Sequence, residues 1–182
     1  MDYSDHMLSI ARQKFPNGHF IQGDMRNFNL DKKIDAALIT GRPTSYLLTS
    51  DDILSTFKCI YNVINTKGYL IFDCIDGNKF IPYIQKNRKV IHKSNVDHME
   101  YIRTSEWYPN EKEPTIIHWK SSYYEQRCAN NQFLGKETIS FKVFTETEIR
   151  SALNKEGFEV MEIKDRLSYA FDTFVVIARK KK

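Results

Sequence analysis

The 182-residue sequence is poor in glycine and cysteine, and each shortage argues against a kind of site. Its seven glycines form no GxG pair, so the chain has no short loop that brings bare backbone close to a cofactor. The three cysteines, Cys59, Cys74 and Cys128, form no CxxC, and the five histidines form no HxH or HxxxH. This pattern predicts reduced thiols, no disulfide framework and no metal site.

The sequence also lacks the features of membrane, secreted and nucleic-acid-binding proteins. It has no apolar run of the ~20 residues that a membrane span requires. The start, "MDYSDHM", has neither the basic region nor the apolar core of a signal peptide. The net charge of +4 is spread along the chain, and the terminal "ARKKK" is the one basic run. We therefore predict a cytoplasmic protein with no membrane or nucleic-acid partner.

A hydrophobic content of 41% is enough for a folded core, and the first half alternates helices with strands. Ser4 is suited to cap a helix that ends before Pro16-Asn17-Gly18. A second helix starts near Ser50 and ends at "NTKG", where Gly68 suits a left-handed position. Strands are expected at "HFIQGD" (19–24), "IDAALIT" (34–40, an apolar run typical of burial on both faces) and "YLIFDCI" (69–75).

The second half has a different hydrophobic pattern, because residues 90–144 alternate apolar and polar side chains. This pattern, which follows an expected short helix at 80–88, predicts an antiparallel meander with one wet face. A capping box from Thr145 to Glu148 begins a helix that ends at Gly157, and two closing strands follow. We predict a single domain, 1–182, with the meander (about 90–144) as an insertion within it.

The order of these elements resembles the class I S-adenosylmethionine (SAM)-dependent methyltransferases. The resemblance rests on "DYSDHMLSIARQKFPNGHFIQGDMRNFNLDKKIDAALIT" and "KGYLIFDCID", and residues 144–182 match the family's last helix and terminal hairpin. The meander is similar to the platform of the small-molecule branch, such as sugar N,N-dimethyltransferases. The resemblance implies an α/β, Rossmann-like sheet with an antiparallel insertion, SAM as cofactor, and a small-molecule amine or hydroxyl as methyl acceptor.

The resemblance also implies a cofactor site built on two acids. Asp2 matches the acid that accepts hydrogen bonds from the ribose hydroxyls, and Asp24 matches the acid that receives the adenine amino group. The backbone N–H of Met25 would reach an adenine ring nitrogen. The other implied positions are Tyr3 and Met7 beside the adenine, Gly23 at the backbone turn, and Thr40 and Gly41 facing the transferring methyl group. Taken alone, an aspartate after a strand is more often a loop or cap residue.

The sequence departs from the family at its start. The family's first strand and GxGxG loop would precede Asp2, where only Met1 stands. In the family's strand order, 3-2-1-4-5-7-6, this sequence has counterparts of strands 3 and 4 but not of the two between them. We therefore expect an N-terminally truncated methyltransferase. Its strand 3 would pair with strand 4, hang loose, or be joined by another chain, and a homodimer is one such arrangement.

Candidates for the acceptor side come from the meander. Methyl transfer depends mainly on alignment, but a base can help to deprotonate the acceptor. The candidate bases are His92, His118 and Tyr124, with Trp107, Trp119 and Tyr123 as walls. Each of these residues is more often an ordinary sheet residue or part of a dimer surface. Three rival functions stay open: a non-catalytic remnant acting by dimerisation or partner binding, a nucleotide- or NAD-binding oxidoreductase, and a nucleic-acid modifier.

Overall fold

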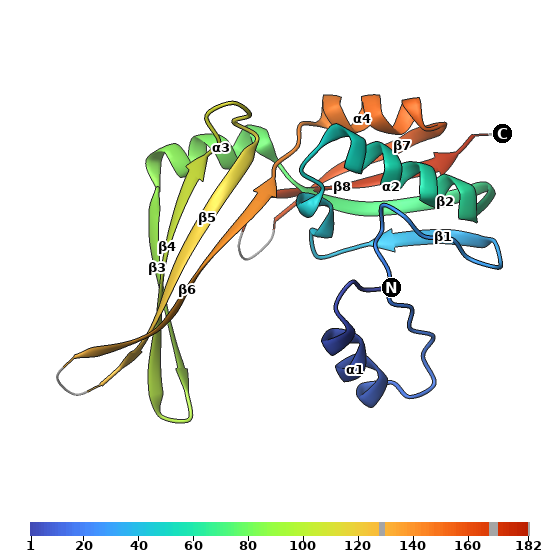
Figure 1. Ribbon diagram of the computed structural model, residues 1–182. Coiled ribbons are helices and arrows are strands. Elements are labelled where there is room, and N and C mark those ends of the chain that lie inside the picture. The colour runs from blue at the N-terminus through green and yellow to red at the C-terminus, as the bar shows by residue number, and fades with distance from the viewer. Residues whose placement is uncertain (128–129, 168–170, 182) are drawn as a thin grey trace.

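The main sheet has the strand order β1-β2-β8-β7, with β1 and β2 parallel and the other pairs antiparallel (Figure 1). The computed structural model describes residues 1–127, 130–167 and 171–181. The strands are β1 (Ile34–Ile39), β2 (Ile64–Ile75), β7 (Phe158–Arg166) and β8 (Thr173–Lys180). Their order corresponds to strands 4-5-7-6 of the expected family order. The α/β, Rossmann-like fold class predicted from the sequence is therefore confirmed.

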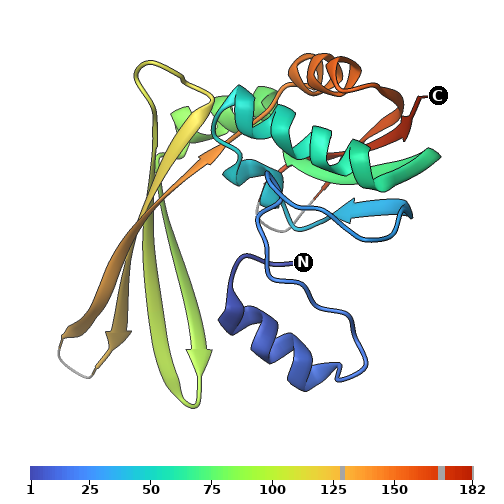
Figure 2. The ribbon, with the colours of Figure 1, turned by 45° about the vertical axis from the view of Figure 1, so that its right-hand side comes forward.

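Two helices, α2 (Ser50–Val63) and α4 (Glu146–Lys155), cover one face of this sheet (Figures 1 and 2). Each begins with a capping box, and the residue that caps α2 is Thr49 rather than the predicted Ser50. Their apolar sides enclose the main core. That core contains Phe57, Ile60, Leu70, Phe72, Ile149, Leu153, Phe158, Phe174 and Val176.

The opposite face of the main sheet is open in the described part of the chain. Figures 1 and 2 show α1 hanging away from that face rather than packing on it. Leu38 of β1 is 66% exposed there, and Tyr69 of β2 is 41% exposed. The prediction that the "IDAALIT" run is buried on both faces is thus wrong, because only one covering layer is described.

Gly68 has a different role from the one predicted. It lies inside β2, and the positive φ angle (66°) belongs to its neighbour Lys67. A Cβ atom on Gly68 would lie 2.7 Å from the carbonyl oxygen of Asp35 and 2.5 Å from Cγ2 of Ile64. Glycine is therefore required here by the close approach of β1 to β2, not by a helix cap.

The first 24 residues form an arm below β1 (Figure 1), whereas Met25 and Phe28 pack against the main core. Its helix, α1 (Asp5–Lys14), is capped by Ser4 as predicted. The strand predicted at residues 19–24 is not formed. Its described sheet-like pairs are two isolated bridges, Asp2 with Gln22 and Asp24 with Asn27, whereas a ladder needs several consecutive pairs. The sequence left three arrangements open for this segment: pairing with strand 4, hanging loose, or being joined by another chain. In the structure the segment is loose from the sheet.

The second sheet is the predicted antiparallel meander, in the order β3-β4-β5-β6. Its strands are β3 (Lys89–Val96), β4 (Met99–Pro109), β5 (Ile116–Gln126) and β6 (Asn131–Lys142), preceded by α3 (Gly77–Lys86). We call this sheet the platform. A second core of Phe80, Ile84, Trp107, Ile117 and Phe141 packs α3 against it. Whether the platform is an insertion within one domain stays a prediction.

Two further findings bear on the exclusions made from the sequence. Cys59 and Cys74 are free thiols, whereas Cys128 lies outside the described residues. Burial raises the pKa of Cys74, whose thiol is sealed in the main core. Across 1–127, 130–167 and 171–181, no helix combines the length and apolar character needed to cross a membrane.

Candidate functional site

The carboxyl ends of β1 and β2 meet at one edge of the main sheet, as parallel neighbours must. After β1, Gly41 and Arg42 turn back with φ angles of 90° and 69°. Their backbone N–H groups donate to the carboxylate of Asp73, at 3.2 and 2.8 Å. The hydroxyl of Thr44, in the short helix η1 (Pro43–Tyr46), donates to the Asp73 carbonyl at 2.6 Å. Asp73, only 5% exposed, therefore fixes the turn that carries Thr40 and Gly41.

The two acids of the predicted adenosine clamp lie on adjacent backbone segments. The N–H of Asp2 donates to the carbonyl of Ile21 at 3.1 Å, and the N–H of Gly23 donates to the carbonyl of Asp2 at 3.0 Å. Asp24 follows directly. The structure thus brings together residues separated by a helix in the sequence. The carboxylate of Asp2 also accepts a hydrogen bond from the N–H of Ser4 at 2.8 Å.

Arg26 ties this segment to the main sheet. Its guanidinium lies 2.6 Å from Asp24 and 3.0 Å from Asp52, which is in the first turn of α2. Since α2 leads directly into β2, its first turn lies toward the carboxyl edge of the sheet. Hydrogen bonds from Arg26 lower the pKa of Asp24, so this carboxylate stays ionised well into acid. The sequence analysis missed Arg26, although its two-residue spacing from Asp24 was a usable signal.

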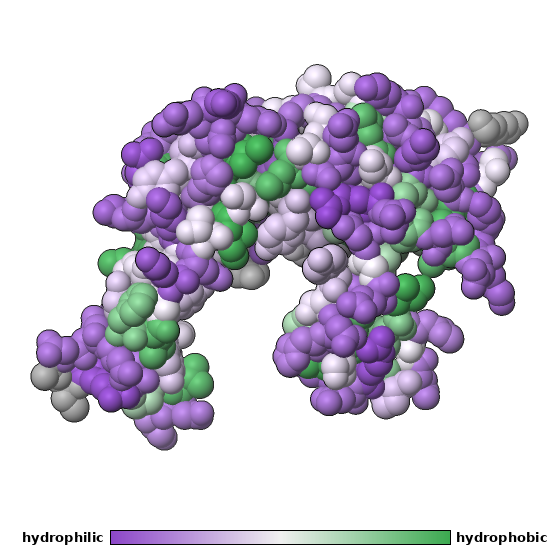
Figure 3. All heavy atoms as spheres, in the orientation of Figure 1, coloured by the Kyte–Doolittle hydropathy of each residue, from purple (hydrophilic) through white to green (hydrophobic). Residues whose placement is uncertain are grey.

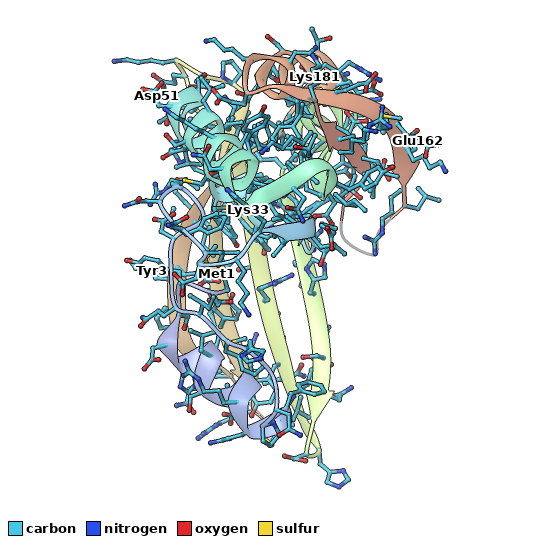
Figure 4. The ribbon with its side chains drawn as sticks, turned by 90° about the vertical axis from the view of Figure 1, so that its right-hand side faces the viewer. Met1, Tyr3, Lys33, Asp51, Glu162 and Lys181 are labelled. Atoms are coloured by element: carbon cyan, nitrogen blue, oxygen red, sulfur yellow. The ribbon has the colours of Figure 1, made fainter. Side chains whose placement is uncertain are left out.

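The remaining adenine-side candidates differ in exposure. Tyr3 is 78% exposed and Met7 54% exposed, so both side chains are available to a ligand. Figure 4 shows Tyr3 and Met1 in the segment between α1 and the sheet. The side chain of Met25, in contrast, packs against the main core, which leaves its backbone for recognition. A Cβ atom on Gly23 would lie 3.1 Å from Sδ of Met1, so this glycine permits a close contact.

A deep hollow separates the arm from the platform, with the main sheet above it (Figure 3). The turn held by Asp73 lies at the edge of the sheet that faces the platform, since β1 runs toward it (Figure 1). The hollow is therefore bordered by three parts that the sequence predicted separately: the adenine-side segment, the carboxyl edge and the platform.

The register of the platform strands divides its side chains between two faces. Trp107 pairs with Trp119, and their rings lie 6.3 Å apart on the face that also receives Phe171 and α3. Phe171 precedes β8, whose first residue pairs with the last residue of β2, so this face adjoins the carboxyl edge. We call it the inner face. The walls proposed from the sequence thus lie on the side of the platform nearest to that edge.

His118 lies on the outer face. Its ring nitrogens contact Oγ of Ser140 at 2.9 Å and the amide nitrogen of Asn110 at 3.2 Å. Both nitrogens are therefore occupied, and the side chain joins β5 to β6 and to the β4–β5 loop. The structure does not bring His118 to the carboxyl edge.

The other two base candidates, His92 and Tyr124, line a cavity of about 250 Å³ farther along the platform. Tyr123 lines it too, and its hydroxyl donates to Glu137. That hydrogen bond raises the pKa of Tyr123, which keeps the phenol protonated. Arg103, also in the lining, was not singled out from the sequence. The alternation in "MEYIRTSEWY" places it on the same face as Trp107, which was the available signal.

The described residues contain no cluster of three or more His, Cys, Asp or Glu side chains able to hold a metal ion. The acids near the carboxyl edge instead accept hydrogen bonds from backbone N–H groups and from Arg26.

The sheet order, the two capped helices and the platform together define the fold of the class I SAM-dependent methyltransferases. A crystal structure of a SAM-dependent methyltransferase from Clostridium acetobutylicum ATCC 824 matches 99% of this chain and 73% of its own, with a TM-score of 0.76 and 18% identity. SAM-bound CalS10, an amino pentose methyltransferase from Micromonospora echinaspora, matches 98% of this chain and 71% of its own, with a TM-score of 0.76 and 17% identity.

Sequence comparison gives a similar result. The chain is 28% identical over 167 residues to YqeM of Bacillus subtilis (strain 168), a protein named as a candidate methyltransferase. The match covers 90% of this chain and 65% of the relative, so the chain spans about two thirds of that relative's length. No family model matches the sequence.

Proposed function

We propose that this chain takes part in SAM-dependent methyl transfer to a small-molecule amine or hydroxyl. In this proposal the arm binds the adenosine of SAM through Asp2 and Asp24, and the platform borders the acceptor. The observation that carries it is that the Asp2–Gly23 segment, the turn held by Asp73 and the platform border one hollow below the main sheet. The neighbouring amino pentose methyltransferase supports a small-molecule acceptor.

SAM supplies the methyl group on a sulfonium, and the protein's task is alignment. Two ionised carboxylates suit the adenosine, since ribose hydroxyls and the adenine amino group are all hydrogen-bond donors. In this proposal Thr40 and Gly41 face the methionine part of SAM. The sequence has no GxG to supply further backbone contacts. The affinity of the isolated chain for SAM is therefore the critical quantity.

One observation favours a second, non-catalytic function. In the described chain β1 pairs on one side only, with β2, and its Leu38 is exposed. An open strand edge beside an exposed apolar side chain is suited to joining another chain. In this alternative the fold acts by dimerisation or partner binding and transfers no methyl group.

Calorimetric titration of the purified chain with SAM separates the two functions. Saturable binding at micromolar SAM supports the proposed function, and a matched titration with ATP should give no such binding. Absence of heat up to millimolar SAM would overturn the proposal and favour the non-catalytic alternative, for which sedimentation gives an independent readout of self-association.

Asp24→Ala should weaken SAM binding by at least about tenfold, because it removes a charged hydrogen-bond acceptor. The free energy of unfolding should change by less than about 1 kcal/mol, since the Asp24–Arg26 pair is partly exposed. Calorimetry and thermal unfolding measure the two quantities.

Arg26→Met provides the matched control for this prediction. It removes the Asp24–Arg26 ion pair, and the Arg26–Asp52 pair with it, but leaves the Asp24 carboxylate in place, still accepting from the backbone N–H of residue 26. If Asp24 contacts the cofactor, Arg26→Met should retain most of the affinity for SAM. Equal losses in both variants would mean that Asp24 acts only by holding Arg26, and a large loss of stability in Asp24→Ala would make it a structural cap.

A further inference from the structure

The inner face of the platform carries buried hydrogen-bond donors that have no partner. Among the described residues these are Nε of Arg103 and the indole Nε1 atoms of Trp107 and Trp119. The guanidinium of Arg103 lies 5.1 Å from the centre of the Trp119 ring, so two of the three donors are neighbours. All three are N–H groups. A buried donor without an acceptor is unfavourable, so this face is suited to a ligand rich in acceptors.

The charge of the adjoining cavity also favours a ligand rich in hydrogen-bond acceptors. Its lining includes Arg103, Lys93 and His92 and contains no carboxylate. Lys93 is neutralised by Glu100, at 2.9 Å. Arg103 has no carboxylate within ion-pair distance in the described chain, and its contact with Nδ1 of His92, at 3.4 Å, adds no negative charge. The cavity therefore keeps one uncompensated guanidinium.

The shape of the cavity limits what that guanidinium can bind. The volume of about 250 Å³ is below the roughly 300–1,000 Å³ typical of sites for drug-sized ligands. Tyr101 and Tyr123, which lie on the same face as Arg103, contribute aromatic walls. A guanidinium is a planar fork of donors that matches a carboxylate in two parallel hydrogen bonds. A small, flat molecule with one carboxylate would satisfy both the walls and the fork.

We propose that Arg103, Trp119 and the tyrosine walls form a binding site for a small aromatic carboxylate. The carboxylate pairs with Arg103, and the ring packs between tyrosine side chains. The proposal rests on this face alone and does not depend on methyl transfer or on SAM binding.

The two tryptophans of the chain provide a direct readout, because both lie on the inner face. Each gives one indole N–H signal in a ¹⁵N-correlated NMR spectrum. Titration with benzoate at constant ionic strength should shift the Trp119 signal saturably, whereas benzamide, its neutral analogue, should not. A saturable shift with inorganic phosphate but not with benzoate would overturn the carboxylate assignment. The absence of any saturable shift would overturn the site itself.

Variants at Arg103 complete the test. Arg103→Met should weaken benzoate binding at least tenfold, and Arg103→Lys should also weaken it, because lysine keeps the charge but lacks the planar fork. Arg150→Met, the same change on α4, is the control and should leave the affinity unchanged. If circular dichroism shows that Arg103→Met does not fold, the affinity of Arg103→Lys for benzoate alone tests the proposal. Wild-type affinity in the folded Arg103 variant, or equal shifts with benzamide, would contradict the proposal.

Discussion

Asp73→Ala should lower the free energy of unfolding by about 2–4 kcal/mol, because it leaves two turn N–H groups without their acceptor. Those groups belong to Gly41 and Arg42, which both have positive φ angles. Without the carboxylate, the N–H of Arg42 loses its acceptor while the residue keeps a left-handed conformation, which is unfavourable for a residue with a side chain. Urea or thermal unfolding measures the loss.

Two further variants make this prediction specific. Asp73→Asn keeps one acceptor oxygen, so its loss of stability should fall between those of the wild type and Asp73→Ala. Asp31→Ala is the matched control, since Asp31 is an exposed loop aspartate, and it should change stability by less than about 0.5 kcal/mol. A loss of under 1 kcal/mol in Asp73→Ala would show that the turn is held by Thr44 and the backbone instead.

The strands and helices that pack on another element could be predicted from the sequence. The apolar run of β2, the capping box at Thr145 and the alternation of the platform are local patterns with one dominant explanation. Residues 19–24 carry a similar local pattern but form no strand. A strand is stabilised by its neighbours, and Asp2 alone does not replace a neighbouring strand.

The part of the candidate site that follows from the order of elements along the chain could be predicted from the sequence. Asp2, Gly23 and Asp24 lie together because a helix and a short return segment bring the chain back to its start. The roles of Arg26 and Arg103 depend on which partners they meet. Arg26 also pairs with a second aspartate on α2, whereas Arg103 forms an ion pair with no carboxylate among the described residues. Composition and spacing do not distinguish these two outcomes, since both arginines stand in polar, partly exposed segments.

Glu113→Gln should lower the free energy of unfolding by about 1–3 kcal/mol at neutral pH, because it removes the countercharge of a buried lysine. Lys142, at the end of β6, is 4% exposed and pairs with Glu113 of the β4–β5 loop. Glu113 itself is 46% exposed, so solvent screening keeps the loss below that for a fully buried pair. Thermal unfolding of both proteins at several pH values measures it.

The pH dependence of this effect has a definite sign. The hydrogen bond from Lys142 lowers the pKa of Glu113 in the folded state. The pair therefore stabilises the fold fully above the ordinary glutamate pKa of about 4.3, and the stabilisation is lost as the pH falls through the lower folded-state value. The stability difference between wild type and Glu113→Gln should accordingly be constant near neutrality and shrink in acid. A difference that grew in acid would contradict the pairing.

Lys142→Met distinguishes the cost of an unpaired charge from the value of the pair itself. A buried ion pair repays little more than its own desolvation, so replacing the lysine by an apolar chain of similar length should change stability by less than about 1 kcal/mol. In the double variant the Glu113→Gln substitution should then cost almost nothing, since no buried charge remains to be compensated. The ammonium of Lys142 lies 5.9 Å from the centre of the Phe144 ring, at the junction between the platform and the main core. If Lys142→Met is instead the more harmful single change, the ion pair contributes net stability to this junction.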